Sequence, residues 1–216
     1  MSTPSHKVVV VGLGQMGQLY LKKLQTLGVQ LFGYDIDPAK EMAIAEMFPN
    51  ETLVDSATCV TDMAIVASNT PSHHRVLIDL MDRGIKHILC EKPLGIDMAA
   101  VNEVRDVMVR TGSQIYTAFL MNFSPALLHL IEKIQVEGLV LTEGSVVWCK
   151  NRYGDKRPTP GDLEDETVHG VGILHNLCAV NQEIRQIDVM ARLTYPRYAS
   201  SEAQAKAYAL DPSFPA

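Results

Sequence analysis

The feature that most constrains the fold of this sequence is a glycine-rich turn between an apolar run and a helical stretch. Lys7–Val11 is a β-branched run, and Gly12, Gly14 and Gly17 follow it with the spacing GxGxxG. In a βα unit the first glycine makes a tight turn, the second lets the backbone approach a pyrophosphate, and the third lets helix and strand pack closely. The N-terminus of the helix adds unpaired N–H groups and the positive end of its dipole. The motif therefore predicts a dinucleotide-binding turn.

A carboxylate follows this turn at the distance expected for a ribose contact. Asp35 comes 18 residues after Gly17, at the end of the predicted strand Gln30–Tyr34. A carboxylate there accepts hydrogen bonds from a ribose diol and repels a 2′-phosphate, so we expect NAD to be preferred over NADP. The alternative is that these are ordinary turn glycines and that Asp35 is a surface acid. Asp37 is interpreted as the N-cap of the next helix.

Strand-like and helical stretches alternate up to about residue 122, which is the pattern of a doubly wound parallel sheet built from βαβ units. The predicted strands are 7–11, 30–34, a short run around 53–54, 63–67, 87–90 and 114–119, and the predicted helices are 16–27, 38–47, 72–83, about 97–110 and one that begins at 124. Beyond them we expect a strand at 144–150, a polar loop at 151–162, a helix at 163–180, a strand at 187–195 and little fixed structure at 199–216. The predicted fold class is therefore α/β, with a Rossmann-type domain over 1–122 and a small, truncated α+β domain over 123–216 for substrate binding and oligomerisation.

Composition excludes several other classes of protein. The 216 residues carry 19 Lys and Arg against 25 Asp and Glu, with no basic block, which argues against nucleic acid as a partner. The polar N-terminus excludes a signal peptide, and no window approaches the roughly 20 apolar residues of a membrane span. The four cysteines lie far apart, without zinc-ligand spacing, so we expect reduced thiols and no metal site. These features indicate a cytoplasmic protein that binds a small molecule.

A second motif lies where the fifth predicted strand ends. Lys92 follows this strand directly, and Pro93 favours an extended backbone at Lys92. Because ligands of doubly wound sheets bind at the carboxyl ends of the strands, the ammonium group of Lys92 could contact a substrate hydroxyl and stabilise alkoxide character. The alternative interpretation is a solvated surface lysine.

Several of these segments together resemble a known family. The sequence GLGQMG at 12–17, the stretch 69–74 after the fourth strand and CEKPLG at 90–95 resemble the glucose-fructose oxidoreductase and inositol dehydrogenase (Gfo/Idh/MocA) family. The segments 119–125 and 163–174 are similar to the family's exit from the nucleotide domain and to its helix with the pattern D-x-G-x-H-x-x-D, so the resemblance covers residues 6 to 195. The cofactor-binding residues that it implies are Gly12, Gly14, Gln15, Met16, Gly17, Asp35, Asn69, Thr70, Pro71, His74, Glu91 and Lys92.

The resemblance also implies three catalytic residues, Lys92, Asp165 and His169. In the implied reaction a secondary alcohol on a sugar, cyclitol or related small molecule is oxidised. His169 takes the hydroxyl proton, Lys92 holds the oxygen, and a hydride passes to the nicotinamide. Histidine suits proton transfer because it ordinarily titrates near neutral pH. Asp165 and His169 lie four positions apart, so one helix face presents both.

This sequence departs from the family pattern at several positions. Thr167 and Gly172 replace the family's glycine and later aspartate, which removes one carboxylate. Leu120, Met121 and Asn122 replace the usual polar and basic residues, so a less polyhydroxylated substrate is expected. His175 is a rival to His169, although a register based on it puts Val171 where the aspartate belongs. The residues interpreted without a firm role are His73, taken as a loop residue, and Arg152 and Arg157, taken as candidate substrate contacts.

The resemblance further implies a longer chain, in which an open sheet supplies part of the pocket and the oligomer interface. Three explanations stay open: a fragment, a reduced form covered by partner chains, and a shortened product that binds NAD without turnover. Exposed sheet edges favour a homo-oligomer. The functions that follow are an NAD-dependent oxidoreductase, a non-catalytic or regulatory NAD-binding protein, and an imine or enone reductase on the same scaffold.

Overall fold

The computed structural model describes residues 6–48, 52–53, 61–141, 143–144, 146 and 162–178, with the side chains of 52–53 and 162–167 left out of the description. The chain divides into two compact units, Met1–Ala118 and Phe119–Ala216. None of the helices in these described ranges is long and apolar enough to cross a membrane.

The first unit is built on a six-stranded sheet in the order β3-β2-β1-β4-β5-β6, with all neighbouring strands parallel. The strands are β1 (Lys7–Val11), β2 (Gln30–Tyr34), β3 (Thr52–Leu53), β4 (Met63–Val66), β5 (His87–Cys90) and β6 (Gln114–Thr117). The order reverses between β1 and β4, because the chain first adds strands on one side of β1 and then on the other. This confirms the predicted doubly wound α/β sheet.

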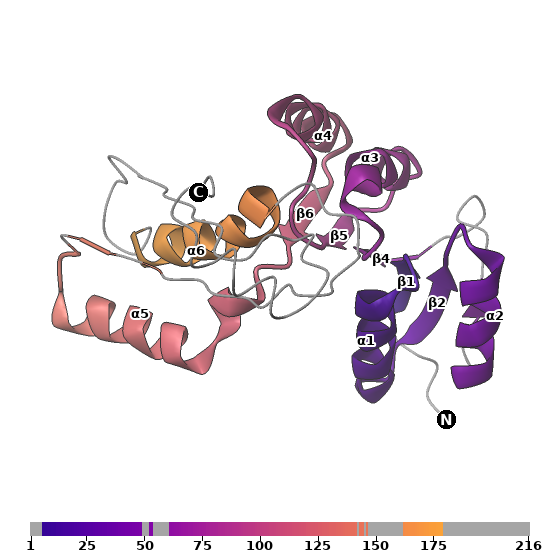
Figure 1. Cartoon of the computed structure of the whole chain (residues 1–216), viewed down its shortest axis with the longest axis horizontal. Helices are drawn as coiled ribbons and strands as arrows, with labels where there is room; N and C mark the ends of the chain where they lie inside the picture. The colour runs from indigo at the N-terminus through magenta and orange to yellow at the C-terminus, as the bar shows by residue number, and fades with distance from the viewer. Residues whose placement is uncertain are drawn as a thin grey trace, which may run out of the picture. The chain divides into compact units, whose positions relative to one another are not determined.

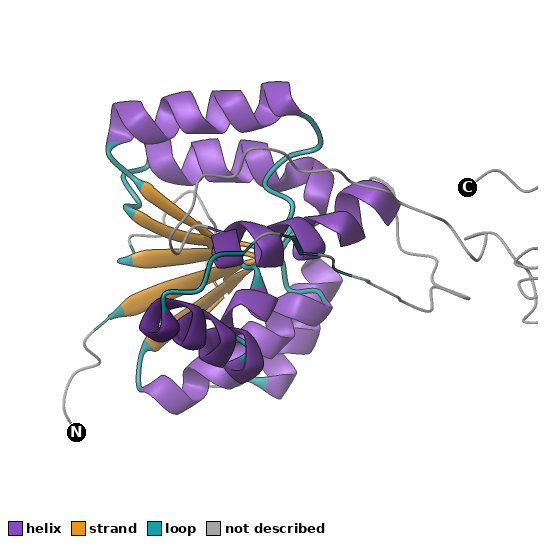
Figure 2. Ribbon diagram, turned by 90° about the vertical axis from the view of Figure 1, so that its left-hand side faces the viewer, coloured by secondary structure: helices purple, strands orange, loops and turns teal. Residues whose placement is uncertain are grey.

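The alternation of side chains along β1 explains why helices cover both faces of the sheet (Figure 2). Val8 and Val10 belong to one buried cluster, together with Leu21 of α1 (Gln15–Leu24) and Ile44 of α2 (Pro38–Met47). Val9 and Val11 belong to a second cluster. Its helical members are Leu77, Leu80 and Met81 of α3 (His73–Asp82) and Val104 of α4 (Met98–Thr111), two helices that lie side by side in Figure 1.

Local signals in the sequence fix where these helices begin and end. The side chain of Asp37 accepts a hydrogen bond from the N–H of Ala39 at 3.0 Å, and that of Asp97 accepts one from Ala100 at 2.8 Å. Both are therefore N-caps, which confirms these two predictions. Gly28 and Gly112 lie in the left-handed region after η1 (Gln25–Leu27) and α4.

The described part of the second unit contains η3 (Leu120–Phe123), α5 (Pro125–Glu137) and α6 (Asp162–Cys178). Ser124 precedes Pro125 at the start of α5, as predicted, and α6 confirms the predicted helix at 163–180. The predicted strand at 144–150, apart from Gly144 and Val146, lies outside the described residues. So do nearly all of the predicted loop at 151–162, the strand at 187–195 and the tail at 199–216.

Candidate functional site

The glycine turn lies at the point where the strand order reverses. Gly12 has φ +93°, and a Cβ there would come within 2.5 Å of the backbone nitrogen of Ser68, the second residue after β4. A Cβ on Gly17 would overlap the carbonyl oxygen of Gly12. A Cβ on Gly14, in contrast, would meet nothing within 4 Å. The fold itself therefore requires Gly12 and Gly17, whereas Gly14 leaves the backbone open on its outer side.

The first turn of α1 has the features of an anion-binding site. Its N-cap is Gly14, and no side chain caps this turn. The N–H groups of Gln15, Met16 and Gly17 are too close to the helix start to find partners within the helix. Uncapped N–H groups beside an open glycine are the arrangement to which a pyrophosphate binds. This part of the structure therefore fits a dinucleotide.

Asp35 follows β2 and is 7% exposed, which shows that the alternative of a surface acid is wrong. Its Oδ2 accepts a hydrogen bond from the N–H of Leu13 at 2.7 Å, and its Oδ1 accepts one from Asp37 at 2.9 Å. The ammonium group of Lys40 lies 3.5 Å from Oδ1. Asp35 therefore fixes the shape of the glycine turn. Since a carboxylate offers about four acceptor sites, it can still accept a bond from a ribose hydroxyl, and that role stays a prediction.

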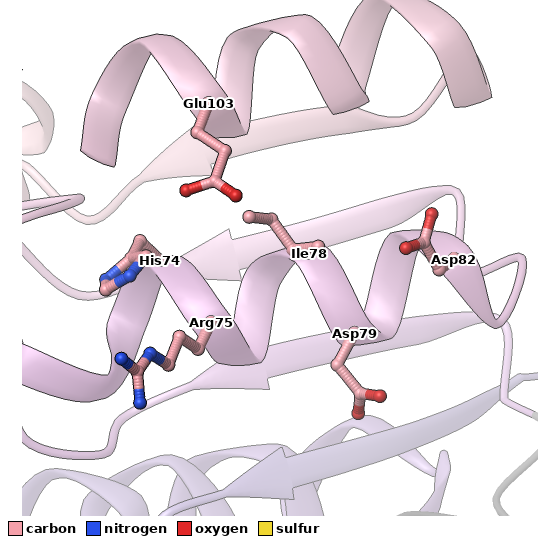
Figure 3. A pocket seen from close by; sticks show the side chains of 6 residues that line it. All are labelled: His74, Arg75, Ile78, Asp79, Asp82 and Glu103. Carbon is pink, nitrogen blue, oxygen red and sulfur yellow. The ribbon is translucent and has the colours of Figure 1, made fainter. Parts of the chain in front are cut away.

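The residues predicted after β4 form a short turn. Asn69 precedes η2 (Thr70–Ser72), and its carbonyl oxygen accepts bonds from the N–H and the hydroxyl of Ser72 at 2.9 and 2.8 Å. His74 lies on α3 at the edge of a shallow hollow of about 450 Å³ (Figure 3). The hollow lies between α3 and α4, because Glu103 of α4 lines it together with residues of α3. It follows α3 as far as the last residue of this helix, Asp82, and so extends away from the glycine turn. Its lining residues are His74, Arg75, Ile78, Asp79, Asp82 and Glu103.

The loop after β5 presents Lys92 between the buried Glu91 and the half-buried Pro93. Glu91 is 9% exposed, its N–H donates to the carbonyl oxygen of Val66 at 2.9 Å, and its Oε1 accepts a hydrogen bond from the Tyr20 hydroxyl at 2.7 Å. Lys92 itself is half-buried, and the Lys92–Pro93 peptide bond is cis. Glu91 therefore connects this loop to α1, a contact that no motif in the sequence predicts.

Burial raises the pKa of the Tyr20 phenol, and the hydrogen bond to Glu91 and the charge of its carboxylate raise it further. Burial also raises the pKa of the Cys90 thiol, again with a contribution from Glu91. In the unfolded chain the thiol loses its proton above its ordinary pKa of 9.0 and the phenol loses its proton above its ordinary pKa of 10.0. The folded protein keeps both protons at these pH values. The free energy of unfolding should therefore be fully retained below about pH 9 and fall as the pH rises further.

This pH dependence can be measured as the midpoint of urea unfolding between about pH 7 and 11. We expect Tyr20→Phe to remove part of the alkaline decline, because that variant has no phenol to ionise at this position. Tyr116→Phe is the matched control, since Tyr116 is 54% exposed. Midpoints that stay constant to pH 11 would contradict the assignment.

The remaining predicted catalytic residues lie on α6, in the second unit. Asp165 and His169 are both within this helix, and His169 is half-buried whereas its rival His175 is exposed. Gly172 packs against the ring of Phe119, which a Cβ at this position would approach to 3.4 Å. The family's aspartate at position 172 would thus compete with Phe119 for space. Arg152 and Arg157 lie outside the described residues.

Sequence reasoning missed His73. This residue was expected in a loop, but it is the first residue of α3 and is 1% exposed. Its Nδ1 lies 2.7 Å from the carbonyl oxygen of Pro93, and its Nε2 lies 3.0 Å from that of Ser68. Helical periodicity indicates that His73 is buried, because it lies four, seven and eight positions before the buried residues Leu77, Leu80 and Met81.

Comparison with known proteins agrees with this geometry. Residues 6–119 match the family GFO_IDH_MocA, described as an oxidoreductase family with an NAD-binding Rossmann fold. The myo-inositol dehydrogenase Hyg17 of Streptomyces leeuwenhoekii is 30% identical over 128 residues, which are 57% of this chain and 39% of that protein. The redox-sensing transcriptional repressor Rex of Oenococcus oeni is 30% identical over 130 residues, covering 55% of this chain and 59% of the repressor.

Among solved structures, myo-inositol 2-dehydrogenase from Lactobacillus plantarum superposes with a TM-score of 0.66 at 18% identity. The match covers 81% of this chain and 56% of that chain, and at this identity it shows the fold alone. In these three matches the aligned part of this chain covers between 39% and 59% of the related protein.

Proposed function

This chain belongs to the Gfo/Idh/MocA family of NAD-binding oxidoreductases, and we propose that it interconverts a secondary alcohol and a ketone on a sugar, cyclitol or related small molecule. The observation that carries this proposal is the pairing of two features at the carboxyl edge of one sheet. One is the glycine turn, open at Gly14 beside the uncapped first turn of α1. The other is Lys92, presented by the loop that follows β5.

In this proposal the chain holds a nicotinamide dinucleotide through the first turn of α1. The N–H groups of Gln15, Met16 and Gly17 bind the pyrophosphate, and Asp35 accepts a hydrogen bond from the adenosine ribose. The carboxylate disfavours a 2′-phosphate at the same place, so NAD is the preferred cofactor. When bound, the nicotinamide ring accepts or supplies the hydride.

Lys92 and His169 are proposed to act on the substrate oxygen. The ammonium group of Lys92 donates a hydrogen bond to this oxygen and stabilises the negative charge that develops there in the transition state. His169 takes the hydroxyl proton in alcohol oxidation and returns it in ketone reduction. Asp165, one helical turn before His169 on α6, orients the imidazole. Lys92 thus stabilises the negative charge on the substrate oxygen, and His169 transfers the hydroxyl proton.

The proposal is tested by a turnover assay with NAD and a panel of polyols. Myo-inositol is the first probe, because the curated relative from Streptomyces leeuwenhoekii is a myo-inositol dehydrogenase. We expect formation of reduced nicotinamide with at least one cyclitol or sugar, and slower formation when NADP replaces NAD. A lack of turnover across the panel, in a protein that binds NADH, would overturn the enzymatic proposal.

The second candidate is a regulatory protein that binds the dinucleotide without turning it over. It is favoured by one observation, the 30% identity to a redox-sensing transcriptional repressor over the nucleotide-binding unit. A regulatory protein should bind NADH and NAD with different affinities and respond with a change of conformation or association. The panel assay separates the two candidates, because only an oxidoreductase produces reduced cofactor.

A further inference from the structure

The buried imidazole of His73 connects two loops that meet the carboxyl edge of the sheet. Its Nδ1 contacts the carbonyl oxygen of Pro93 at 2.7 Å, and its Nε2 contacts that of Ser68 at 3.0 Å. Both partners can only accept a hydrogen bond, so a neutral ring donates to one of them and a doubly protonated ring donates to both. The ring is 1% exposed, and burial of a polar ring is costly unless it is hydrogen-bonded. The contacts with the two carbonyl oxygens therefore hold the ring in this one position.

The first of these contacts fixes the loop that carries Lys92. On one side of Lys92, the N–H of Glu91 donates to Val66 at 2.9 Å and its carboxylate accepts from Tyr20 at 2.7 Å. On the other side, the carbonyl of Pro93 contacts His73. The backbone of Lys92 is therefore held from both neighbours, and His73 supplies the contact on the carboxyl side.

The second contact reaches the glycine turn. Ser68 lies directly over Gly12, where a Cβ would come within 2.5 Å of its backbone nitrogen. The hydroxyl of Ser68 also hydrogen-bonds that of Ser72 at 2.8 Å, which closes the loop after β4. Through Ser68 and Pro93, a single imidazole thus joins the loop packed on the glycine turn to the loop that presents Lys92.

We propose that His73 is a positioning residue, which fixes Lys92 relative to the glycine turn through its contacts with Pro93 and Ser68. The inference rests on the proposed role of Lys92. His73 touches neither cofactor nor substrate in this account and acts only through the two loops. Because misplacement of a reacting group by about 1 Å can cost up to about 10²-fold in rate, loss of these contacts should affect turnover more than cofactor binding.

Three substitutions separate the contacts. His73→Phe keeps a ring of similar size and removes both polar contacts. His73→Asn keeps a donor at the depth of Nδ1, within reach of Pro93, whereas His73→Gln keeps one at the depth of Nε2, within reach of Ser68. His87→Asn is the matched control, because His87 is exposed at the amino end of β5, the strand that leads into the Lys92 loop.

The first readout is the acylation rate of the Lys92 amine, followed by mass spectrometry with the exposed Lys133 as internal reference. We expect His73→Phe to raise this rate by about fivefold or more, and His73→Asn to restore it to near the wild-type value, with His87→Asn unchanged. An unchanged rate in a folded His73→Phe variant would overturn the inference. If His73→Phe does not fold, equal rates in His73→Asn and His73→Gln would overturn it.

The second readout is turnover of myo-inositol with NAD, together with NADH affinity. We expect kcat of His73→Phe to fall about 10-fold or more while Kd for NADH changes less than about threefold. A parallel loss of both would show a merely structural role and overturn the inference. If the wild type does not turn over any polyol, the proposed function fails, and the acylation rates still test the positioning of Lys92.

Discussion

Replacing Lys92 with alanine should lower kcat for alcohol oxidation by about 10²- to 10³-fold, the usual cost of removing one donor to a developing oxyanion. Kd for NADH should change much less than kcat, because the pyrophosphate is proposed to bind to the first turn of α1. The loss should appear almost entirely in kcat, since the stabilised charge exists only in the transition state. Steady-state kinetics with the best polyol of the panel measure it.

Two companion variants make this result specific. Lys86→Ala removes an exposed lysine just before the amino end of β5, at the opposite edge of the sheet, and should behave as the wild type. His169→Asn should lose alcohol oxidation as well, because it removes the proposed base. Undiminished kcat in Lys92→Ala would show that the ammonium group has no part in the reaction, and activity that survives in His169→Asn alone would favour imine or enone reduction.

The second large effect is expected within the glycine turn, where two alanine substitutions should fail in different ways. Gly17→Ala should destabilise the protein by about 3 kcal/mol or more, since the added methyl group overlaps the carbonyl oxygen of Gly12 and the backbone must move. Gly14→Ala should leave stability within about 0.5 kcal/mol, because its Cβ meets no atom of the chain. The same methyl group lies where the pyrophosphate is proposed to bind, so affinity for NADH should fall.

Urea unfolding and NADH titration of both variants test this separation. Gly17→Ala should lose stability and cofactor affinity together, whereas Gly14→Ala should lose only cofactor affinity. Wild-type affinity in Gly14→Ala would place the dinucleotide elsewhere. A Gly17→Ala variant as stable as the wild type would contradict the close packing of helix and turn.

The nucleotide-binding unit was predictable because its signals are local. The alternation of Val8, Val9, Val10 and Val11 between two buried clusters follows from strand geometry, and Gly17 is explained by the carbonyl oxygen of Gly12 within the same turn. The start of α2 follows from Asp37 and Pro38. Each of these inferences needs only neighbouring residues and one general rule.

Two contacts that the sequence did not predict join residues far apart in the chain. Tyr20 and Glu91 are 71 positions apart, and His73 and Pro93 are 20 apart. No periodicity or motif specifies such pairs, because they depend on which loops the strand order places side by side. His73 illustrates this, since its place in the sequence does not show that its ring is buried against two loops, and the cofactor contact of the adjacent His74 stays a prediction.

In the second unit, the helical pattern predicted α6, but not what it packs against. Gly172 is explained by the Phe119 ring beside it, a contact across 53 positions. The departure from the family's aspartate is thus matched by an apolar contact.

The most direct test of the central claim is a titration of the purified chain with NADH and with NADPH, followed by nicotinamide fluorescence. We expect saturable binding of NADH at one site per chain, with weaker binding of NADPH because the carboxylate of Asp35 should disfavour a 2′-phosphate. Absence of binding for both cofactors in a folded protein would contradict it, because the open glycine turn and the uncapped helix would then have no ligand of the proposed kind.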